Sequence, residues 1–168
     1  MKRFLIYWLP VLLWAGVIFY ASSQPYKEQD LRPALSRYLD TEAIGDVFSG
    51  VSFQYAEEEV SVKALGAAGF VEFFIRKAAH FTVYFVLAFL LYRALSRSSR
   101  SRGRAFWPAF ILAGLYAASD EFHQSFTGGR TPLPLDVGLD SFSALIGTVV
   151  AFLVYRGQKR ISRHRMFP

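Results

Sequence analysis

Four long apolar runs limit what this chain can fold into. They cover residues 4–21, 78–95, 105–120 and 139–155, and the first has 18 residues without a charge. A helix of that length is about long enough to cross a hydrocarbon core of ~30 Å. The apolar fraction of 53% and the aromatic fraction of 17% also exceed those of ordinary soluble proteins. We therefore predict an all-α integral membrane protein, with residues 1–168 forming one domain built as a four-helix bundle.

The basic residues give this predicted bundle an orientation. The N-terminus, the loop after the second run and the C-terminal tail hold 12 of the 19 Lys and Arg residues and none of the 13 acids. Short loops rich in Lys and Arg stay in the cytoplasm. We expect a multi-pass membrane protein with both termini in the cytoplasm. Residues 25–69 and the loop after the third run then lie outside.

The first run has a second interpretation. Small residues follow it at positions 21–23, which is compatible with a cleaved signal peptide. The length and aromatic content of residues 4–21 favour a retained helix instead. Pro10 is expected to kink that helix without ending it.

The extracytoplasmic segment, residues 25–69, contains weaker patterns. Leucines recur at helical spacing within residues 31–39, which predicts a short surface helix. Apolar residues alternate over positions 51–55, which indicates a strand or a segment that dips into the membrane interface. The three glutamates at 57–59 are expected to form a solvated acidic patch.

Each of the last three runs carries an ionisable residue at the same depth. His80, Asp120 and Asp140 each lie 15 residues from the predicted cytoplasmic boundary. At ~1.5 Å per residue this places them about 22 Å up the membrane core, in the outer leaflet. Charges at such a depth are costly, so they need partners and often serve a function.

Further polar residues follow at spacings of three and four, which keep them on the same helix faces. Glu121 is the exception, since it points about 100° away from Asp120 and is expected to face water or a neighbour. The outward polar pocket that we predict comprises Lys77, His80, Tyr84, Ser119, Asp120, Glu121, His123, Gln124, Arg130, Asp136 and Asp140, with Ser22, Ser23 and Gln24 reaching it from the first helix.

These residues allow several kinds of site. A charge network could merely fasten the helix ends, because Arg76, Lys77 and Arg130 nearly balance the carboxylates. Carboxylates beside two imidazoles could perform general acid–base chemistry, and Arg130 could bind an anion. No cofactor is firmly implied, although N and O ligands suit a divalent metal. The metal candidates are His80, Asp120, His123 and Asp140.

Other classes are disfavoured by the composition. The chain has no cysteine, which excludes disulfides, thiolate metal sites and a cysteine nucleophile. Its net charge of +6 lies beside the apolar runs and forms no recognisable nucleic-acid-binding pattern. A proton- or ion-coupled transporter would need polar groups on both sides of the membrane, and the inner two-thirds of each run lacks them.

Several motifs resemble those of the VanZ-like bacterial membrane proteins. They are Lys77-x-x-His80-Phe-x-x-Tyr84, Ser119-Asp120-Glu121-x-His123-Gln124-x-Phe126 with Arg130, Asp136 followed by a late Gly147, and Ser22-Ser23-Gln24. The resemblance covers most of the chain except residues 25–69. Where this chain has Asp140, the family is expected to have Asn.

The resemblance implies an integral membrane protein with several helices. The founding member is associated with resistance to teicoplanin, by a route not explained through altered cell-wall peptide termini. We expect the pocket to bind or shield an envelope lipid or a wall precursor, so that membrane lipids, a peptidoglycan precursor or a lipoglycopeptide are the partners. The alternative is a membrane enzyme that acts on a lipid-linked headgroup by acid–base or metal-assisted chemistry.

Overall fold

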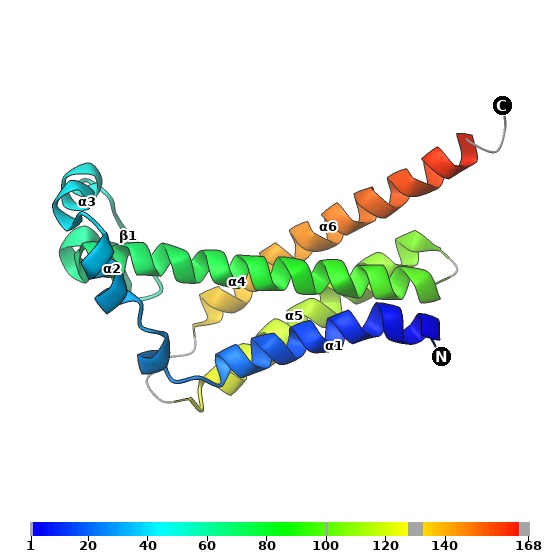
Figure 1. The fold of residues 1–168 in the computed structure, drawn as a ribbon, viewed down its shortest axis with the longest axis horizontal. Helices are drawn as coiled ribbons and strands as arrows, with labels where there is room; N and C mark the ends of the chain where they lie inside the picture. The colour runs from blue at the N-terminus through cyan, green and yellow to red at the C-terminus, as the bar shows by residue number, and fades with distance from the viewer. Residues whose placement is uncertain (1, 100, 128–132, 165–168) are drawn as a thin grey trace.

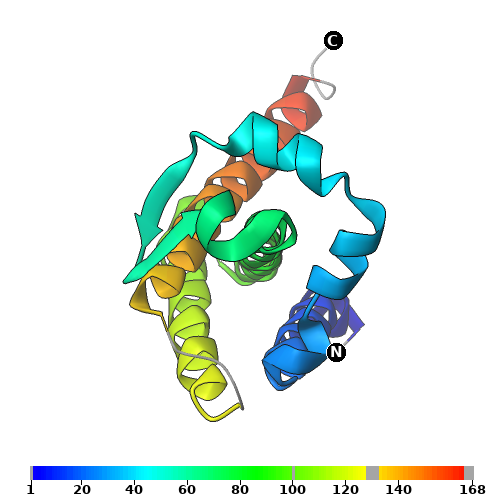
Figure 2. The same cartoon turned by 90° about the vertical axis from the view of Figure 1, so that its left-hand side faces the viewer.

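Four long helices run side by side in the computed structural model, which describes residues 2–99, 101–127 and 133–164 (Figures 1 and 2). The helix α4 packs against each of the other three, and α5 also packs against α6 and α1. The far half of α6 extends beyond its neighbours (Figure 1). The four helices are α1 (Lys2–Ser22), α4 (Val62–Ser98), α5 (Phe106–Gln124) and α6 (Pro134–His164).

Three of these helices are long and apolar enough to cross a membrane. The apolar spans are Phe4–Ser22 in α1, Val62–Arg97 in α4 and Pro134–Arg156 in α6. The helix α5 does not qualify by composition, because its last turns carry Asp120, Glu121 and His123. Its inner face nevertheless packs small buried alanines against the other helices.

The helix α4 begins much earlier than the crossing predicted at residues 78–95. Ser61 caps it by accepting a hydrogen bond from the backbone N–H of Ala64 at 3.0 Å. Gly66 then interrupts the helical geometry with φ 70°, a conformation that glycine adopts without steric cost. Residues 62–69 of α4 therefore lie within the segment predicted at residues 25–69, and the helix then continues through Glu72.

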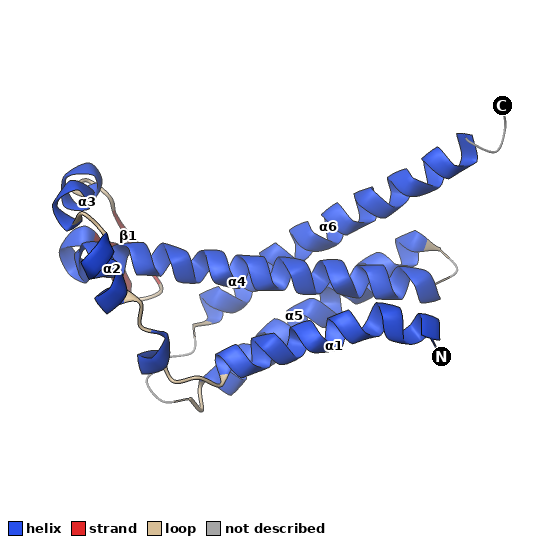
Figure 3. Cartoon of the chain, viewed as in Figure 1, coloured by secondary structure: helices blue, strands red, loops and turns tan. Residues whose placement is uncertain are grey.

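Short elements connect α1 to α4 and arch across one end of the long helices (Figures 2 and 3). The predicted surface helix and strand are both confirmed, as α2 and β1. The strand pairs in antiparallel fashion with a second strand, so that Phe53 lies opposite Val60. The all-helical prediction therefore omitted a β-hairpin. The elements are η1 (Tyr26–Gln29), α2 (Arg32–Tyr38), α3 (Thr41–Phe48), β1 (Ser52–Tyr55) and β2 (Glu58–Ser61).

The closest approach between long helices involves Gly147 on α6. A Cβ atom added there would lie 3.0 Å from the backbone C and Cα atoms of Phe85 on α4 and would also overlap its carbonyl oxygen. Ser143, Ala144 and Thr148 on the same face of α6 are fully buried. Small residues of this kind allow two helix backbones to approach closely in a membrane protein.

Candidate functional site

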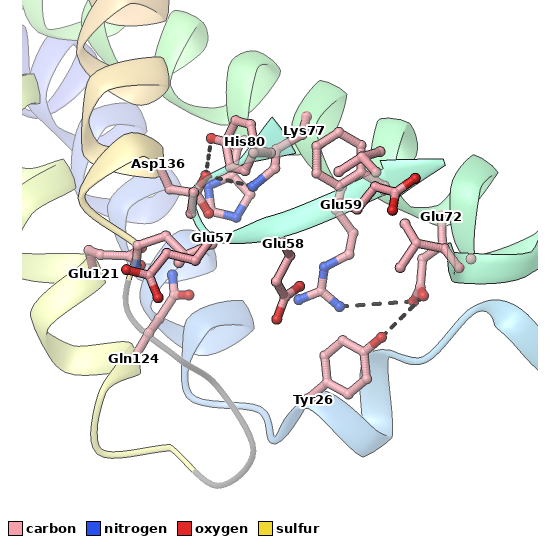
Figure 4. A pocket seen from close by; sticks show the side chains of 18 of the residues that line it. Tyr26, Glu57, Glu58, Glu59, Glu72, Lys77, His80, Glu121, Gln124 and Asp136 are labelled. Carbon is pink, nitrogen blue, oxygen red and sulfur yellow. Dashed lines mark hydrogen bonds and ion pairs between the residues drawn. The ribbon is translucent and has the colours of Figure 1, made fainter. Parts of the chain in front are cut away.

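A cavity of about 650 Å³ lies at one end of the long helices, beneath the β-hairpin of residues 52–61 (Figure 4). Its wall combines residues that are far apart in the sequence. The outer part of α4, the last turn of α5, the first turn of α6 and the hairpin turn all contribute to it. The predicted site residues among its lining are Lys77, His80, Glu121, Gln124 and Asp136.

Asp136 joins three of these elements. The ammonium of Lys77 and the hydroxyl of Tyr55 both donate to its Oδ1 atom, each at 2.5 Å. The Lys77 nitrogen also lies 4.2 Å from the centre of the Tyr55 ring, in cation–π geometry. Because Asp136 occupies the first turn of α6, the helix dipole favours its negative charge. Burial of Tyr55, together with its hydrogen bond to Asp136, raises the pKa of the phenol.

His80 and Asp140 form a second pair directly beside the first. The Nδ1 atom of His80 lies 3.3 Å from Oδ2 of Asp140, whose side chain is only 2% exposed. An imidazole that donates through Nδ1 keeps Nε2 as an acceptor. The other carboxylate oxygen of Asp140 is buried and has no hydrogen-bond partner within the described part of the chain. This arrangement can orient His80 for acid–base chemistry toward the cavity.

Asp120 is hydrogen-bonded to two neutral side chains from α4 and α5. Its Oδ2 atom accepts hydrogen bonds from the hydroxyl of Tyr84 at 2.8 Å and from Nε2 of Gln124 at 3.0 Å. Asp120 makes no hydrogen bond to His80 or Asp140, which pair with each other. The side chains of Asp120, Tyr84 and Gln124 are all buried. Asp120 is therefore held by neutral donors beneath the cavity and does not line it.

His123 faces α1 and does not reach the cavity. Its Nδ1 atom lies 3.3 Å from the hydroxyl of Ser22, and its ring stacks on Phe19 with centroids 4.7 Å apart. Three residues along a helix correspond to about 60° of rotation around its axis. That angle is enough to turn Asp120 toward α4 and His123 toward α1.

Three other predicted site residues also lie outside the cavity wall. Ser119 is exposed and donates to the backbone carbonyl of Tyr116 at 2.8 Å. Ser23 and Gln24 donate to carbonyls of their own helix, α1. Arg130 lies outside the described residues. Ser119 is consequently not placed to act with His123 as a nucleophile.

Glu121 is buried and faces a neighbouring segment, which is the second of the two alternatives that we expected. Its Oε1 atom accepts a hydrogen bond from the backbone N–H of Leu133 at 2.5 Å, just before α6 begins. The side chain is 7% exposed and belongs to the cavity wall. Leu133, the residue before α6, therefore lies against this carboxylate.

Glu72 belongs to the cavity wall and was missed from the sequence. The side chain is buried and accepts hydrogen bonds from the hydroxyl of Tyr26 at 3.2 Å and the backbone N–H of Leu31 at 3.1 Å. Arg32 and Arg76 lie 3.6 and 3.9 Å from it. Burial, reinforced by Glu72, raises the pKa of Tyr26. The sequence feature that could have identified Glu72 is its position as the single charge within the otherwise apolar residues 70–75.

The four metal-ligand candidates do not converge on one point, although two of them, His80 and Asp140, contact each other. His80 pairs with Asp140, whereas Asp120 contacts Tyr84 and His123 contacts Ser22. Within residues 2–99, 101–127 and 133–164, no group of three or more His, Asp or Glu side chains is arranged to hold a metal ion.

The fold and these contacts define a helical membrane protein with a polar cavity at one end of its long helices. The sequence matches the family described as VanZ/LLP1 over residues 6–155, and the chain belongs to this family. No curated protein matches the chain. No solved structure matches it either.

Proposed function

We propose that α1, α4, α5 and α6 all cross the bacterial cytoplasmic membrane, with both termini in the cytoplasm and the cavity outside. The distribution of Lys and Arg supports this orientation, since 12 of the 19 lie in three acid-free segments of the sequence. The described parts of these segments lie at the opposite end of the long helices from the hairpin (Figure 1). The packing of α5 between α4 and α6 supports its inclusion as a fourth crossing.

In this orientation the protein binds or shields an envelope lipid or a wall precursor at the outer surface. The observation that carries this proposal is the open cavity of about 650 Å³, in which Lys77, His80 and Asp136 meet beneath the hairpin. Its size and its polar groups suit the headgroup of a lipid-linked molecule. Family membership adds a link to glycopeptide resistance.

Expression in a susceptible host tests the proposal. Tolerance to teicoplanin should rise more than tolerance to vancomycin, because teicoplanin carries an acyl chain that holds it at the membrane surface. His80→Gln should abolish the difference, whereas Glu42→Gln, on the exposed surface of α3, should preserve it. Equal shifts for the two antibiotics, or no shift, would contradict the proposal.

A second candidate function is acid–base catalysis on a lipid-linked headgroup. The observation that favours it is the contact between His80 and Asp140 at the cavity wall. His80 would transfer the proton, and Asp140 would orient the imidazole. Lipid and wall-precursor profiles of deletion and overexpression strains test this candidate. Unchanged profiles in both strains would contradict it.

A further inference from the structure

We propose that the cavity recognises a primary ammonium group on the headgroup that it binds. This inference rests on the proposed binding function and specifies the chemistry of that same site. The argument starts from the charges on the cavity wall, where the described lining includes six carboxylate side chains and only three Lys or Arg side chains.

All three basic side chains already have acidic partners. Lys77 is paired with Asp136 at 2.5 Å. Arg76 lies 3.9 Å from Glu72, and Arg32 lies 2.7 Å from Asp30 as well as 3.6 Å from Glu72. The hydrogen bonds from Arg32 hold the pKa of Asp30 well below its usual range, at about 2. The Nη1 atom of Arg76 has no hydrogen-bond partner among the described residues, but it is buried, so a phosphate or carboxylate ligand could reach it only if the wall rearranged.

Three carboxylates of the wall, from Glu57, Glu58 and Glu121, form no ion pair with a Lys or Arg side chain of the described residues. Glu57 and Glu58 lie at the hairpin turn, exposed at the cavity. Glu121 accepts a backbone N–H, and Glu59 accepts the hydroxyl of Ser52 at 2.9 Å and lies within the electrostatic influence of Lys63. Within the described part of the chain, the wall therefore offers more carboxylate acceptors than positive charges, from the hairpin and from α5.

The buried carboxylates next to the cavity also outnumber the positive charges that contact them. Asp120, Glu121, Asp136 and Asp140 are each at most 8% exposed, at the adjoining ends of α5 and α6. Among the described residues, Lys77 is the one Lys or Arg side chain that contacts any of these four. The Oδ1 atom of Asp140 is buried without a hydrogen-bond donor. Because buried carboxylates need compensating charge or donors, a cation in the cavity would stabilise this cluster.

The aromatic part of the wall also favours cations. The Lys77 nitrogen lies over Tyr55 and, at 5.3 Å, over Phe73. The Arg76 guanidinium lies 4.6 Å from the centre of the Tyr26 ring. Ring faces carry negative electrostatic potential, so they attract ammonium groups and repel anions. Carboxylates and ring faces together discriminate against a purely anionic headgroup.

Native mass spectrometry of the full chain in detergent tests this inference with matched lipids. The probes are phosphatidylethanolamine and its N-acetylated form, which differ in the ammonium charge, and phosphatidylglycerol. We expect phosphatidylethanolamine to bind about tenfold more tightly than the N-acetylated lipid, because a few partly exposed charge contacts together give a factor of this order. The preference should weaken as salt is added.

A triple variant, Glu57→Gln/Glu58→Gln/Glu121→Gln, tests the residues. It should lose about tenfold in affinity for phosphatidylethanolamine and little for the N-acetylated lipid. The matched control carries the same change of charge on exposed residues away from the cavity, as Glu28→Gln/Glu42→Gln/Asp46→Asn, and should keep wild-type affinity. If the triple variant fails to fold, Glu57→Gln/Glu58→Gln, at the exposed turn, serves in its place.

The outcomes separate this inference from the proposed function. Tighter binding of phosphatidylglycerol, lost in Lys77→Met, would overturn ammonium recognition while keeping the cavity as a headgroup site. Absence of saturable binding by all three lipids would contradict both proposals. Free ethanolamine that displaces the lipid supports recognition of the ammonium alone. Selective lipid binding that ethanolamine does not displace supports recognition of the ammonium within a lipid headgroup.

Discussion

The ammonium of Lys77 lies 2.5 Å from Oδ1 of Asp136, which joins α4 to the first turn of α6. The same oxygen accepts the hydroxyl of Tyr55 from the hairpin. One carboxylate thus fixes the distance between two long helices and also holds the element that covers the cavity.

Removing either member of this pair should destabilise the protein. Lys77→Met and Asp136→Asn should each lower the free energy of unfolding by about 1–3 kcal/mol, between the values for exposed and buried pairs. The double variant should lose less than the sum of the two, as measured by unfolding in detergent. Lys27→Met, on the exposed surface of η1, is the control. Additive losses would show that the pair does not stabilise the fold.

Tyr55→Phe should loosen the hairpin without unfolding the long helices. The variant removes the hydrogen bond to Asp136 but retains the aromatic ring, at a cost of about 0.5–1.5 kcal/mol. Amide exchange over residues 52–61 should become faster, while exchange within α4 and α6 stays unchanged. Tyr38→Phe, whose side chain is 81% exposed, is the matched control. Unchanged exchange in the hairpin would contradict the role of this contact.

Gly147→Ala should be strongly destabilising because its Cβ would overlap the backbone of Phe85. The two helices would have to separate, with a loss of about 1–3 kcal/mol or more, as for overpacked cores. Gly138→Ala on the same helix has open space around its Cβ and should stabilise α6 slightly. Similar melting temperatures for the two variants would contradict the close helix contact.

The sequence predicts the long helices well, because apolar runs and helical spacing directly reflect burial. It also predicts that Lys77, His80, Asp136 and Asp140 occur at the outer helix ends. The hairpin was harder to predict from the sequence, since its turn contains Ala56 with φ 57° where Gly or Asn would be typical. Without that signal the alternating residues 51–55 could not be given a partner strand.

The partners of individual side chains were the least predictable part of the site. Asp120 and His123 share a helix surface, yet small differences in direction send them to different neighbours. Glu72 resembled an interruption of an apolar run, because its partners come from a segment without strong periodicity. Such contacts depend on tertiary packing, which helical spacing alone does not contain.

Asp120→Asn should preserve the fold and remove the teicoplanin tolerance that we propose for the wild type. Among the described residues no cation contacts Asp120, so the neutral amide leaves no charge unpaired, and its oxygen can still accept from Tyr84. Asp120→Leu should reduce the folded yield, because it leaves the buried Tyr84 hydroxyl without an acceptor. His80→Gln, at the cavity wall, should behave like Asp120→Asn. If Asp120→Asn aggregates or melts far below the wild type, the carboxylate has a structural role instead.

The outward orientation of the cavity can be measured directly, because the chain contains no cysteine. Glu58→Cys places a single thiol at the cavity mouth, and Ser101→Cys places one in the connection between α4 and α5, at the opposite end of the helices (Figure 1). A membrane-impermeant maleimide should label Glu58→Cys in intact cells and Ser101→Cys only after the cells are opened. Labelling of Ser101→Cys in intact cells, with protection of Glu58→Cys, would place the cavity in the cytoplasm and contradict the proposed function.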